Sequence, residues 1–464
     1  MRTLVKEAIA KVGESITLQG WVNSRRDHGK IIFIDLVDRS GVVQVVGGDI
    51  LATLKPNSAI EIEGLVKARP EKLVNPNLLS GKIEIEATKA SVLNPAVDLP
   101  IPIDTDGYDL QETVKLKYRY LDLRRPRLQK MLRLRSAFIR AIRESLYQQD
   151  FTEVETPILT KSTKEGARDF LVPSRLQPGK FFALPQSPQQ YKQLLMVAGL
   201  ERYFQIAKCI RDEDLRADRG FEFTQLDLEM SFVDAQSVMH SVENTVKESV
   251  AAAGGKLKSD PFPVFTYQEA MDKFGADKFD LRSEQDKKDG LLAFAWVIKF
   301  PFFKKVDKKD VAEVRDSKSG WTFTHNPFSQ PMPEFMADHL KGKNIESILT
   351  TQYDLVCNGY EAGGGSIRAH QPEVLAATYK IMGYTDAETK ASIGHMLEAL
   401  SYGAPPHGGI ALGLDRLVML LTGETSLKDT VAFPMSSSGQ TSVMDAPSPV
   451  TPEQLNELHL KIDR

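Results

Sequence analysis

The first hundred residues contain five short runs of mainly β-branched and other apolar side chains. The runs span residues 16–22, 31–37, 42–46, 59–66 and 82–87, and glycine, aspartate, asparagine and proline separate them. Runs of this length between turn residues predict β-strands. Because no strong helical pattern accompanies them, residues 1–103 are expected to form a five-stranded OB-fold β-barrel, a fold that commonly binds oligonucleotides.

A second, larger domain is expected after a proline-rich connection. Residues 93–104 read LNPAVDLPIPID, and their prolines favour an extended segment. We assign residues 104–130 to a hinge or linker that carries a basic cluster and, at Pro126, a residue suited to begin a helix. Beyond it, helical and strand-like runs mix without regular alternation. Residues 131–464 are therefore predicted to be an α+β domain built on an antiparallel β-sheet flanked by helices.

One strand-like run in this second domain carries polar residues at alternate positions. Residues 223–230 read FTQLDLEM, in which Gln225, Asp227 and Glu229 alternate with apolar side chains after Phe223. Such alternation predicts a half-buried β-strand. Acidic side chains embedded in an apolar strand need partners.

The segment before this strand is rich in arginine. It reads RDEDLRADRG and contains Arg211, Glu213, Arg216 and Arg219. Planar guanidinium groups bind phosphate oxygens through paired hydrogen bonds. A loop of mixed charge is more commonly a solvated face, but the alternating strand that follows favours a binding site.

A second candidate phosphate site lies near the C-terminal end. Residues 407–421 read HGGIALGLDRLVMLL, in which Gly413 is followed at once by an apolar helix. Arg416 falls in the first turn, where the helix dipole disfavours a cation but favours a bound anion. Together with the arginine-rich loop, this segment predicts a site for a nucleoside triphosphate.

Composition sets limits on the class of protein. The 464 residues are 42% hydrophobic, which suffices for two or three domains with cores of their own. Two cysteines give no disulfide framework, and the longest apolar run, residues 291–298, is far shorter than the roughly 20 residues of a membrane span. We therefore expect a cytoplasmic protein without a membrane segment. A net charge of −3 argues against indiscriminate binding of nucleic acid.

Several long motifs resemble a known family. Arg211 and Glu213 with Phe223, and the GLDR of residues 413–416, resemble motifs 2 and 3 of class II aminoacyl-tRNA synthetases, and FTEVETPIL (151–159) resembles motif 1. KYRYLDLRR (117–125), STKEGARDFLVPSR (162–175), LPQSPQQYKQLL (184–195) and RADRGFEFTQLD (216–227) are similar to bacterial-type aspartyl-tRNA synthetases. The resemblance runs along the whole chain.

The resemblance implies an aspartate–tRNA ligase that uses ATP. Arg211 on the α-phosphate and Arg416 on the γ-phosphate would be the catalytic residues, because this chemistry depends on positioning and charge neutralisation. Glu213 would accept from the adenine amino group while Phe223 stacks on the ring. The implied ATP-binding set is Arg211, Asp212, Glu213, Gly220, Phe223, Glu361, Gly413, Leu414, Asp415 and Arg416.

An aspartate pocket requires fixed cations for the side-chain carboxylate, and Lys192 and Arg368 are the candidates. The resemblance adds residues for the substrate ammonium and a histidine that closes over the substrate. The implied set is Glu165, Ser187, Gln189, Lys192, Arg211, Asp227, His325 and Arg368. A lone histidine such as His325 is more commonly an ordinary surface or core residue.

Two acids are candidates for a metal. Asp354 and Glu361 are seven residues apart, in a segment with a strand-like run and three glycines. Carboxylates that hold Mg²⁺ normally share it with substrate phosphates, so we assign both acids to Mg²⁺ on ATP. The alternative is that they are surface acids.

Four residues of the barrel are expected to read the tRNA anticodon. An aromatic side chain can stack an unpaired base, and an amide can read its edge. By the resemblance, Phe33 and Gln44 take these roles, with Arg26 and His28 beside them. Histidine at position 28 accompanies family members that also charge tRNA(Asn), so the expected partners are tRNA(Asp) and tRNA(Asn). A strictly discriminating enzyme remains an alternative.

The chain departs from the bacterial pattern in three places. The GAD insertion domain is absent near residues 283–290, Gly220-Phe221 stand where Gln-Pro is common, and Ser24 replaces an arginine. Motif 1 implies a homodimer. Three other functions stay open: a synthetase for asparagine or lysine, a non-enzymatic nucleic-acid-binding protein, and a paralogue that acts on another acceptor.

Overall fold

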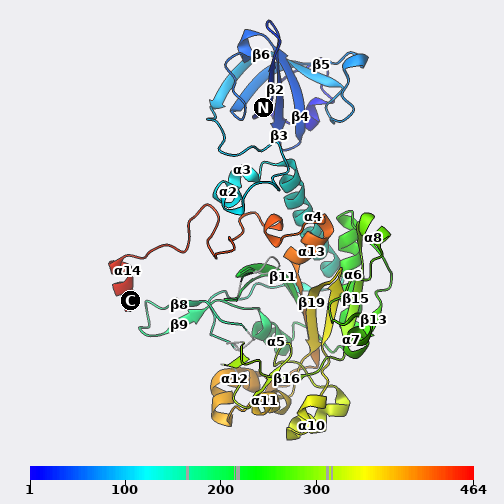
Figure 1. The fold of residues 1–464 in the computed structure, drawn as a ribbon, viewed down its shortest axis with the longest axis vertical. Helices are drawn as coiled ribbons and strands as arrows, with labels where there is room; N and C mark the ends of the chain where they lie inside the picture. The colour runs from blue at the N-terminus through cyan, green and yellow to red at the C-terminus, as the bar shows by residue number, and fades with distance from the viewer. Residues whose placement is uncertain (164–166, 214, 216–219, 310–312, 315–316, 464) are drawn as a thin grey trace. The chain divides into compact units, whose positions relative to one another are not determined.

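The chain divides into two compact units, Met1–Pro102 and Ile103–Arg464, and each has its own hydrophobic core (Figure 1). The computed structural model describes residues 1–463 apart from 164–166, 214, 216–219, 310–312 and 315–316. Within these ranges, no helix is both long and apolar enough to cross a lipid bilayer.

The first unit is a closed β-barrel. Its five strands follow the order β2 (Ser15–Asp27), β3 (Ile32–Asp38), β4 (Gly41–Gly47), β6 (Ile83–Asn94) and β5 (Ala59–Ala68), and pairing of β5 with β2 closes the ring. A short β1 (Arg2–Thr3) runs parallel to β2 and precedes α1 (Val5–Ala8). Along β3, Ile32, Ile34 and Leu36 are buried while the residues between them are partly exposed, as the alternating pattern requires. The predicted OB-fold is confirmed.

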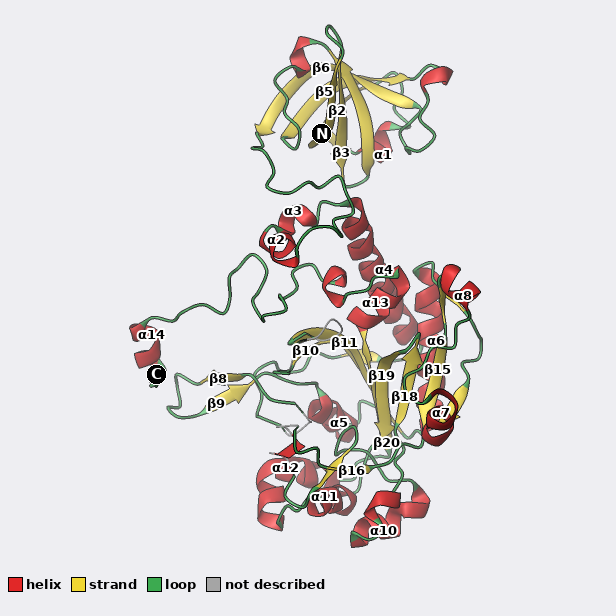
Figure 2. Cartoon of the chain, in the orientation of Figure 1, coloured by secondary structure: helices red, strands yellow, loops and turns green. Residues whose placement is uncertain are grey.

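The second unit is built on an eight-stranded sheet (Figure 2). In order across the sheet, the strands are β13 (Val264–Thr266), β15 (Phe294–Ile298), β18 (Tyr353–Cys357), β19 (Tyr360–Ile367), β20 (His407–Gly413), β11 (Glu222–Ser231), β10 (Arg202–Ile210) and β7 (Thr152–Glu153). From β15 to β10 all neighbours are antiparallel, as predicted, whereas the two edge strands pair in parallel.

Shorter elements complete this unit. Three two-stranded sheets pair β8 (Leu171–Pro173) with β9 (Phe181–Ala183), β12 (Lys256–Leu257) with β14 (Leu291–Leu292), and β16 (Phe303–Lys305) with β17 (Trp321–Phe323). The helices are α2 (Glu112–Lys117), α3 (Arg119–Asp122), α4 (Pro126–Gln148), α5 (Gln189–Val197), α6 (Ala235–Ala252), α7 (Tyr267–Phe274), α8 (Glu284–Lys288), α10 (Met336–Lys341), α11 (Pro372–Ile381), α12 (Asp386–Ser401), α13 (Leu414–Thr422) and α14 (Pro452–Glu457).

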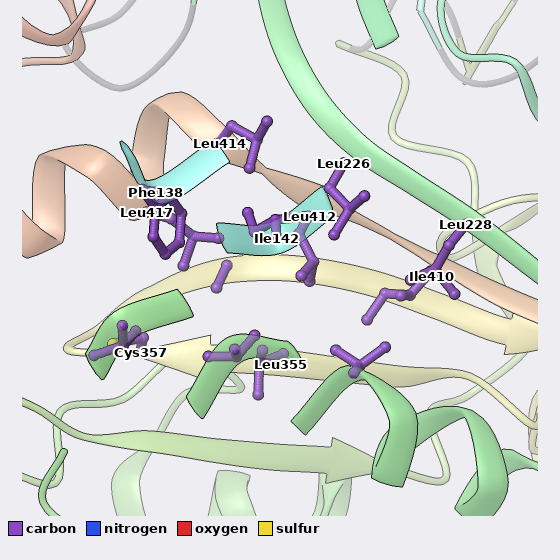
Figure 3. Close-up of a cluster of buried hydrophobic side chains, with 14 of the residues drawn as sticks. Phe138, Ile142, Leu226, Leu228, Leu355, Cys357, Ile410, Leu412, Leu414 and Leu417 are labelled. Atoms are coloured by element: carbon purple, nitrogen blue, oxygen red, sulfur yellow. The ribbon is translucent and has the colours of Figure 1, made fainter. Parts of the chain in front are cut away.

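The main core lies on one face of the large sheet. Figure 3 shows Phe138 and Ile142 of α4 beside Leu226 of β11 and Leu412 of β20, and α13 adds Leu417. These side chains are at most 2% exposed, and each such burial contributes about 1.5–3 kcal/mol. One face of β11 and β20 is therefore fixed against helices, which leaves the other face for polar side chains.

Residues 104–130 differ from the expected linker, because they fold as part of the second unit. Asp122 lies between two buried arginines, 2.6 Å from Arg119 Nη1 and 2.7 Å from Arg125 Nε. Arg119 also donates to the backbone carbonyl of Ala432, far along the chain. Helix α4 begins at Pro126, as expected. The basic cluster is thus partly a buried ionic network rather than a solvated surface.

Near residues 283–290, where the family resemblance predicts an insertion that this chain lacks, the chain makes a short capped helix. Ser283 caps α8 by accepting from the Asp286 backbone amide, and the Asp286 carboxylate accepts from the Ser283 amide in return. Directly after α8, β14 pairs with β12. The shortened connection is therefore closed locally by ordinary secondary structure.

Candidate active site

The polar face of the sheet begins with the alternation along β11. Leu226, Leu228 and Met230 belong to the core, so Gln225, Asp227 and Glu229 point to the opposite face. On the neighbouring strand β20, Asp227 is paired with Ala411 and Glu229 with Gly409. The acids are thus bordered by backbone and by small side chains.

Lys192 and Arg368 converge on one carboxylate. Lys192, on α5, lies 2.9 Å from Asp227 and 3.2 Å from Glu229. Arg368, just after β19, donates to Glu229 through Nε at 2.8 Å and Nη2 at 3.2 Å. It also donates to Ser366 and to the Gly409 carbonyl. The two predicted carboxylate-binding cations, 1% and 2% exposed, therefore meet at Glu229.

Burial and charge set the protonation of the two acids in opposite directions. Burial raises the pKa of Asp227 to about 6, although the Lys192 ammonium opposes this shift. Burial would also raise the pKa of Glu229, but Arg368 and Lys192 outweigh it and hold that pKa below its ordinary value. Glu229 is therefore the ionised partner of the two cations.

Glycine at position 409 permits this arrangement. A Cβ there would lie 2.2 Å from Oε2 of Glu229 and 2.0 Å from the Leu228 carbonyl. Any side chain would collide with both atoms. Gly409 thus lets β20 pass close to the charged group.

A pocket of about 220 Å³ brings together most of the predicted ATP residues. The guanidinium of Arg211 lies over the Phe223 ring, 5.0 Å from its centre. The residues predicted for ATP that line the pocket are Arg211, Glu213, Gly220, Phe223, Glu361, Gly413, Asp415 and Arg416. Segments that are distant in sequence therefore meet at one cavity.

The other predicted ATP residues, and Asp415 itself, are engaged in other ways. The Leu414 side chain is fully buried in the main core (Figure 3). Asp415 pairs with Arg135 at 2.5 Å and accepts from the Thr224 amide at 2.9 Å. Asp212 lies 3.7 Å from Arg168. These residues were predicted to bind ATP, but their side chains mainly stabilise the local structure.

A larger cavity of about 460 Å³ adjoins this pocket. The two share Gly220, Phe223, Thr224, Asp415 and Leu427, and the segment after α13 forms much of the larger cavity's wall. Phe223 therefore lines both cavities.

The predicted metal ligands have cationic partners. His325 Nε2 lies 3.1 Å from Asp354, and Lys278 Nζ lies 2.8 Å from Glu361. Burial raises the pKa of Asp354. Burial favours the neutral ring of His325, but Asp354 outweighs it and raises the histidine pKa. Among the described residues, no three or more His, Cys, Asp or Glu gather as a metal cluster.

The remaining aspartate-site predictions fall near α5 or outside the described ranges. The Ser187 hydroxyl accepts from the Gln189 amide at 3.3 Å, and Gln189 donates to Gln193 at 3.2 Å. Gln193 in turn contacts His407 on β20 at 3.1 Å. Glu165, and also Arg216 and Arg219 of the arginine-rich loop, lie outside the residues that the structure describes.

Sequence reasoning left three residues of the site unassigned. Glu229 was noticed only as part of an alternating strand, although its spacing of two from Asp227 places both acids on one face. Gln193 and Lys278 gave no signal of their own, because neither periodicity nor charge pattern relates them to β20 or Glu361. Their partners are distant in sequence.

In the barrel, the four predicted anticodon residues form one patch. Arg26 donates to Asp35 through both terminal nitrogens at 3.0 Å and contacts Gln44 at 3.5 Å. The rings of His28 and Phe33 meet edge to face, 5.7 Å apart. Arg26 and Phe33 are also cross-strand partners. The patch thus combines an aromatic ring, an amide and a cation, which suits an unpaired base.

Known families match both units. Residues 111–437 match the family described as tRNA synthetases class II (D, K and N), and residues 16–93 match the OB-fold nucleic acid binding domain.

Curated relatives are similar along the whole chain. One from Geobacillus sp. (strain WCH70), named aspartate–tRNA(Asp/Asn) ligase, is 39% identical over 97% of this chain and 96% of its own length. One from Geobacillus kaustophilus, named aspartate–tRNA ligase, is 38% identical over 97% of both. The first alignment spans 574 positions against 464 residues here, so the relative carries residues that this chain lacks.

Solved structures share the fold. A crystal structure of a putative aspartyl-tRNA synthetase from Leishmania major Friedlin has a TM-score of 0.75 at 19% identity, over 97% of this chain and 94% of its own. The asparaginyl-tRNA synthetase from Pyrococcus horikoshii, with asparaginyl-adenylate, has a TM-score of 0.73 at 23% identity, over 94% and 98%.

Proposed function

The chain belongs to the family of class II tRNA synthetases (D, K and N), and we propose that it is an aspartate–tRNA ligase. It activates L-aspartate with ATP and transfers the product to tRNA. The predicted resemblance to bacterial-type aspartyl-tRNA synthetases is confirmed by similarity along the whole chain, and the shorter length of this chain fits a missing GAD insertion.

The choice of aspartate depends on the convergence of Lys192 and Arg368. Arg368 uses four N–H groups on Glu229, Ser366 and the Gly409 carbonyl, and a guanidinium has about five. Lys192 donates to Asp227 at 2.9 Å and lies 3.2 Å from Glu229, and an ammonium has three N–H groups. Within the described residues, each cation therefore has at least one N–H group that makes no hydrogen bond to the protein and that could donate to a ligand. Two such donors match the two oxygens of a carboxylate better than an amide or an ammonium.

The first step needs no side-chain nucleophile. An oxygen of the aspartate α-carboxylate attacks the α-phosphorus of ATP, the bond to the β-phosphate bridging oxygen breaks, and pyrophosphate leaves. Arg211 at the α-phosphate and Arg416 at the γ-phosphate stabilise the charge that develops. Their shared pocket, which Phe223 also lines beneath the Arg211 guanidinium, supports these roles.

The donor set at Asp354 and Glu361 fits Mg²⁺. The two carboxylates lie on the neighbouring strands β18 and β19, close enough for their charges to interact. Two carboxylates are fewer than the roughly six oxygens that Mg²⁺ takes, so phosphate oxygens and water would complete its shell. When bound, the ion would neutralise the phosphates.

In the second step, the terminal ribose 3′-hydroxyl of the tRNA attacks the aspartyl carbonyl, and AMP leaves. The barrel patch of Arg26, His28, Phe33 and Gln44 would bind the anticodon. The names of relatives that charge tRNA(Asp/Asn) and the histidine at position 28 support a non-discriminating enzyme. We also propose a homodimer through motif 1, where Ile158 and Leu159 are half exposed; sedimentation of the purified chain tests it.

The deciding experiment is pyrophosphate exchange into ATP with aspartate, asparagine or lysine, followed by charging of tRNA(Asp) and tRNA(Asn). We expect exchange with aspartate alone and charging of both tRNAs. Exchange driven by asparagine or lysine would overturn the substrate assignment. If the wild type charged only tRNA(Asp), and His28→Leu did not change this preference, the enzyme would be discriminating rather than non-discriminating.

A further inference from the structure

Lys278 stands beside the candidate metal ligands, although no motif pointed to it. Its Nζ lies 2.8 Å from Oε2 of Glu361, and its charge also interacts with Asp354. Its side chain is 40% exposed. The Lys278 ammonium therefore pairs with one of the two carboxylates to which we assign Mg²⁺ and interacts electrostatically with the other.

The backbone at Lys278 is anchored. The next residue, Phe279, is 6% exposed and stacks on Phe274 with ring centres 4.1 Å apart. The Phe279 carbonyl accepts from the Gly359 amide at 3.0 Å, and Gly359 lies in the turn that leads into β19 and Glu361. The lysine is thus held at the strand that carries its partner, which distinguishes it from a solvated surface lysine.

Further anchoring fixes Glu361 itself. Its backbone carbonyl accepts from Nη1 of Arg416, the arginine assigned to the γ-phosphate. The Glu361 carboxylate is paired, at the edge of the ATP pocket, with a cation that belongs to the chain.

Building on the proposed function, we propose that Lys278 is a positioning residue that occupies the Glu361 carboxylate until a divalent ion arrives with ATP. With Lys278 in place, the pair of carboxylates offers a free divalent ion one unit less negative charge. An ion that arrives with the negatively charged triphosphate displaces the ammonium. The lysine thereby keeps the site from filling with metal alone and holds Glu361 in place for the nucleotide complex.

The test measures metal binding to the ligand-free full chain. Mn²⁺ serves as the probe, and the electron paramagnetic resonance signal of the unbound ion reports binding without ATP. We expect Lys278→Met to bind Mn²⁺ at least roughly tenfold more tightly than the wild type, because a neighbouring positive charge is removed. Lys278→Arg keeps the charge and should bind as weakly as the wild type.

Two further variants make the result specific. Lys287→Met removes an exposed lysine that pairs with Glu284 at 2.7 Å and should leave Mn²⁺ binding unchanged. In Lys278→Met, an added Glu361→Gln should abolish the gain. Unchanged or weaker Mn²⁺ binding by Lys278→Met would overturn the proposal. Absence of aspartate-dependent pyrophosphate exchange in the wild type would instead overturn the proposed function, since the Mn²⁺ measurement uses neither substrate.

Discussion

Four buried charges form the centre of the candidate site at the residue scale. Lys192 and Arg368 face Asp227 and Glu229, so the formal charges balance. Burying a single charge without a partner is costly. This cost explains why the two cations proposed to bind the substrate carboxylate are themselves paired with carboxylates of the chain. In the proposed function, the aspartate side chain would add a carboxylate to a group of residues that is already neutral overall, so specificity would depend on hydrogen-bond donors that are correctly placed.

Removal of Arg211 should abolish activation while sparing tRNA binding. Arg211→Ala deletes the guanidinium that lies over Phe223 and lines the ATP pocket. We expect aspartate-dependent pyrophosphate exchange to fall at least ~100-fold, the usual effect of losing a donor to developing charge. A filter assay should show unchanged tRNA affinity. Arg140→Ala, at a side chain that is 75% exposed, is the matched control. Near-normal exchange by Arg211→Ala would refute the assignment.

Asp227 should make stability depend on pH. Burial raises its pKa from 3.8 to about 6 in the folded chain, so the folded chain keeps a proton that the unfolded chain has lost. That stabilisation is present below about pH 4 and disappears as the pH rises through 6. Relative to Asp227→Asn, the wild type should therefore lose about 2 kcal/mol between pH 4 and 7.

Urea midpoints of both proteins across this range measure the difference. A constant difference between Asp227→Asn and the wild type across this range would show that Asp227 does not carry this proton.

At the element scale, the pairing of β11 with β20 decides what the site can hold. The period of two along β11 was visible in the sequence, and it correctly separated the core residues from the acids. Which strand would lie beside β11 was not visible, because the pairing joins residues about 180 positions apart, as Leu228 and Ile410 show. The small residues of β20 could therefore not be assigned to the site from the sequence, because their role depends on the acids of the neighbouring strand β11.

Gly409→Ala tests the close approach of these strands. Its Cβ would fall 2.0 Å from a backbone oxygen and 2.2 Å from Glu229, so β20 must shift and the charged cluster with it. We expect stability to fall by about 1–3 kcal/mol, as for overpacking. We also expect the KM for aspartate to rise more than the KM for ATP. Thermal unfolding and exchange kinetics measure both.

Gly394→Ala is the control for that substitution. It lies in α12, where the new Cβ would meet only the flexible Lys390 side chain at 3.2 Å. Alanine favours helix over glycine by about 1 kcal/mol, so this variant should be as stable as the wild type or more so. If Gly409→Ala behaved in the same way, the close approach would not matter to the site.

At the scale of the whole molecule, the sequence predicted both folds but not every boundary. The barrel and the antiparallel sheet follow from local patterns of alternation. The segment 104–130 was predicted to be a hinge or linker because it follows a proline-rich stretch, whereas Arg119 and Arg125 are buried against Asp122. Their burial depends on contacts such as that with Ala432, which no local pattern reveals.

Because the chain forms two compact units, recognition of tRNA and activation of aspartate should be separable by mutation. Phe33 lies in the barrel, and every residue assigned to ATP lies in the other unit. Loss of one stacked base costs about 1–3 kcal/mol, so Phe33→Ala should raise the KM for tRNA roughly tenfold or more and leave pyrophosphate exchange unchanged. Val12→Ala, at a half-exposed side chain of the same barrel, should change neither. Equal losses in charging and exchange would show that Phe33 supports the fold rather than the anticodon, and unchanged charging would remove the barrel patch from tRNA recognition.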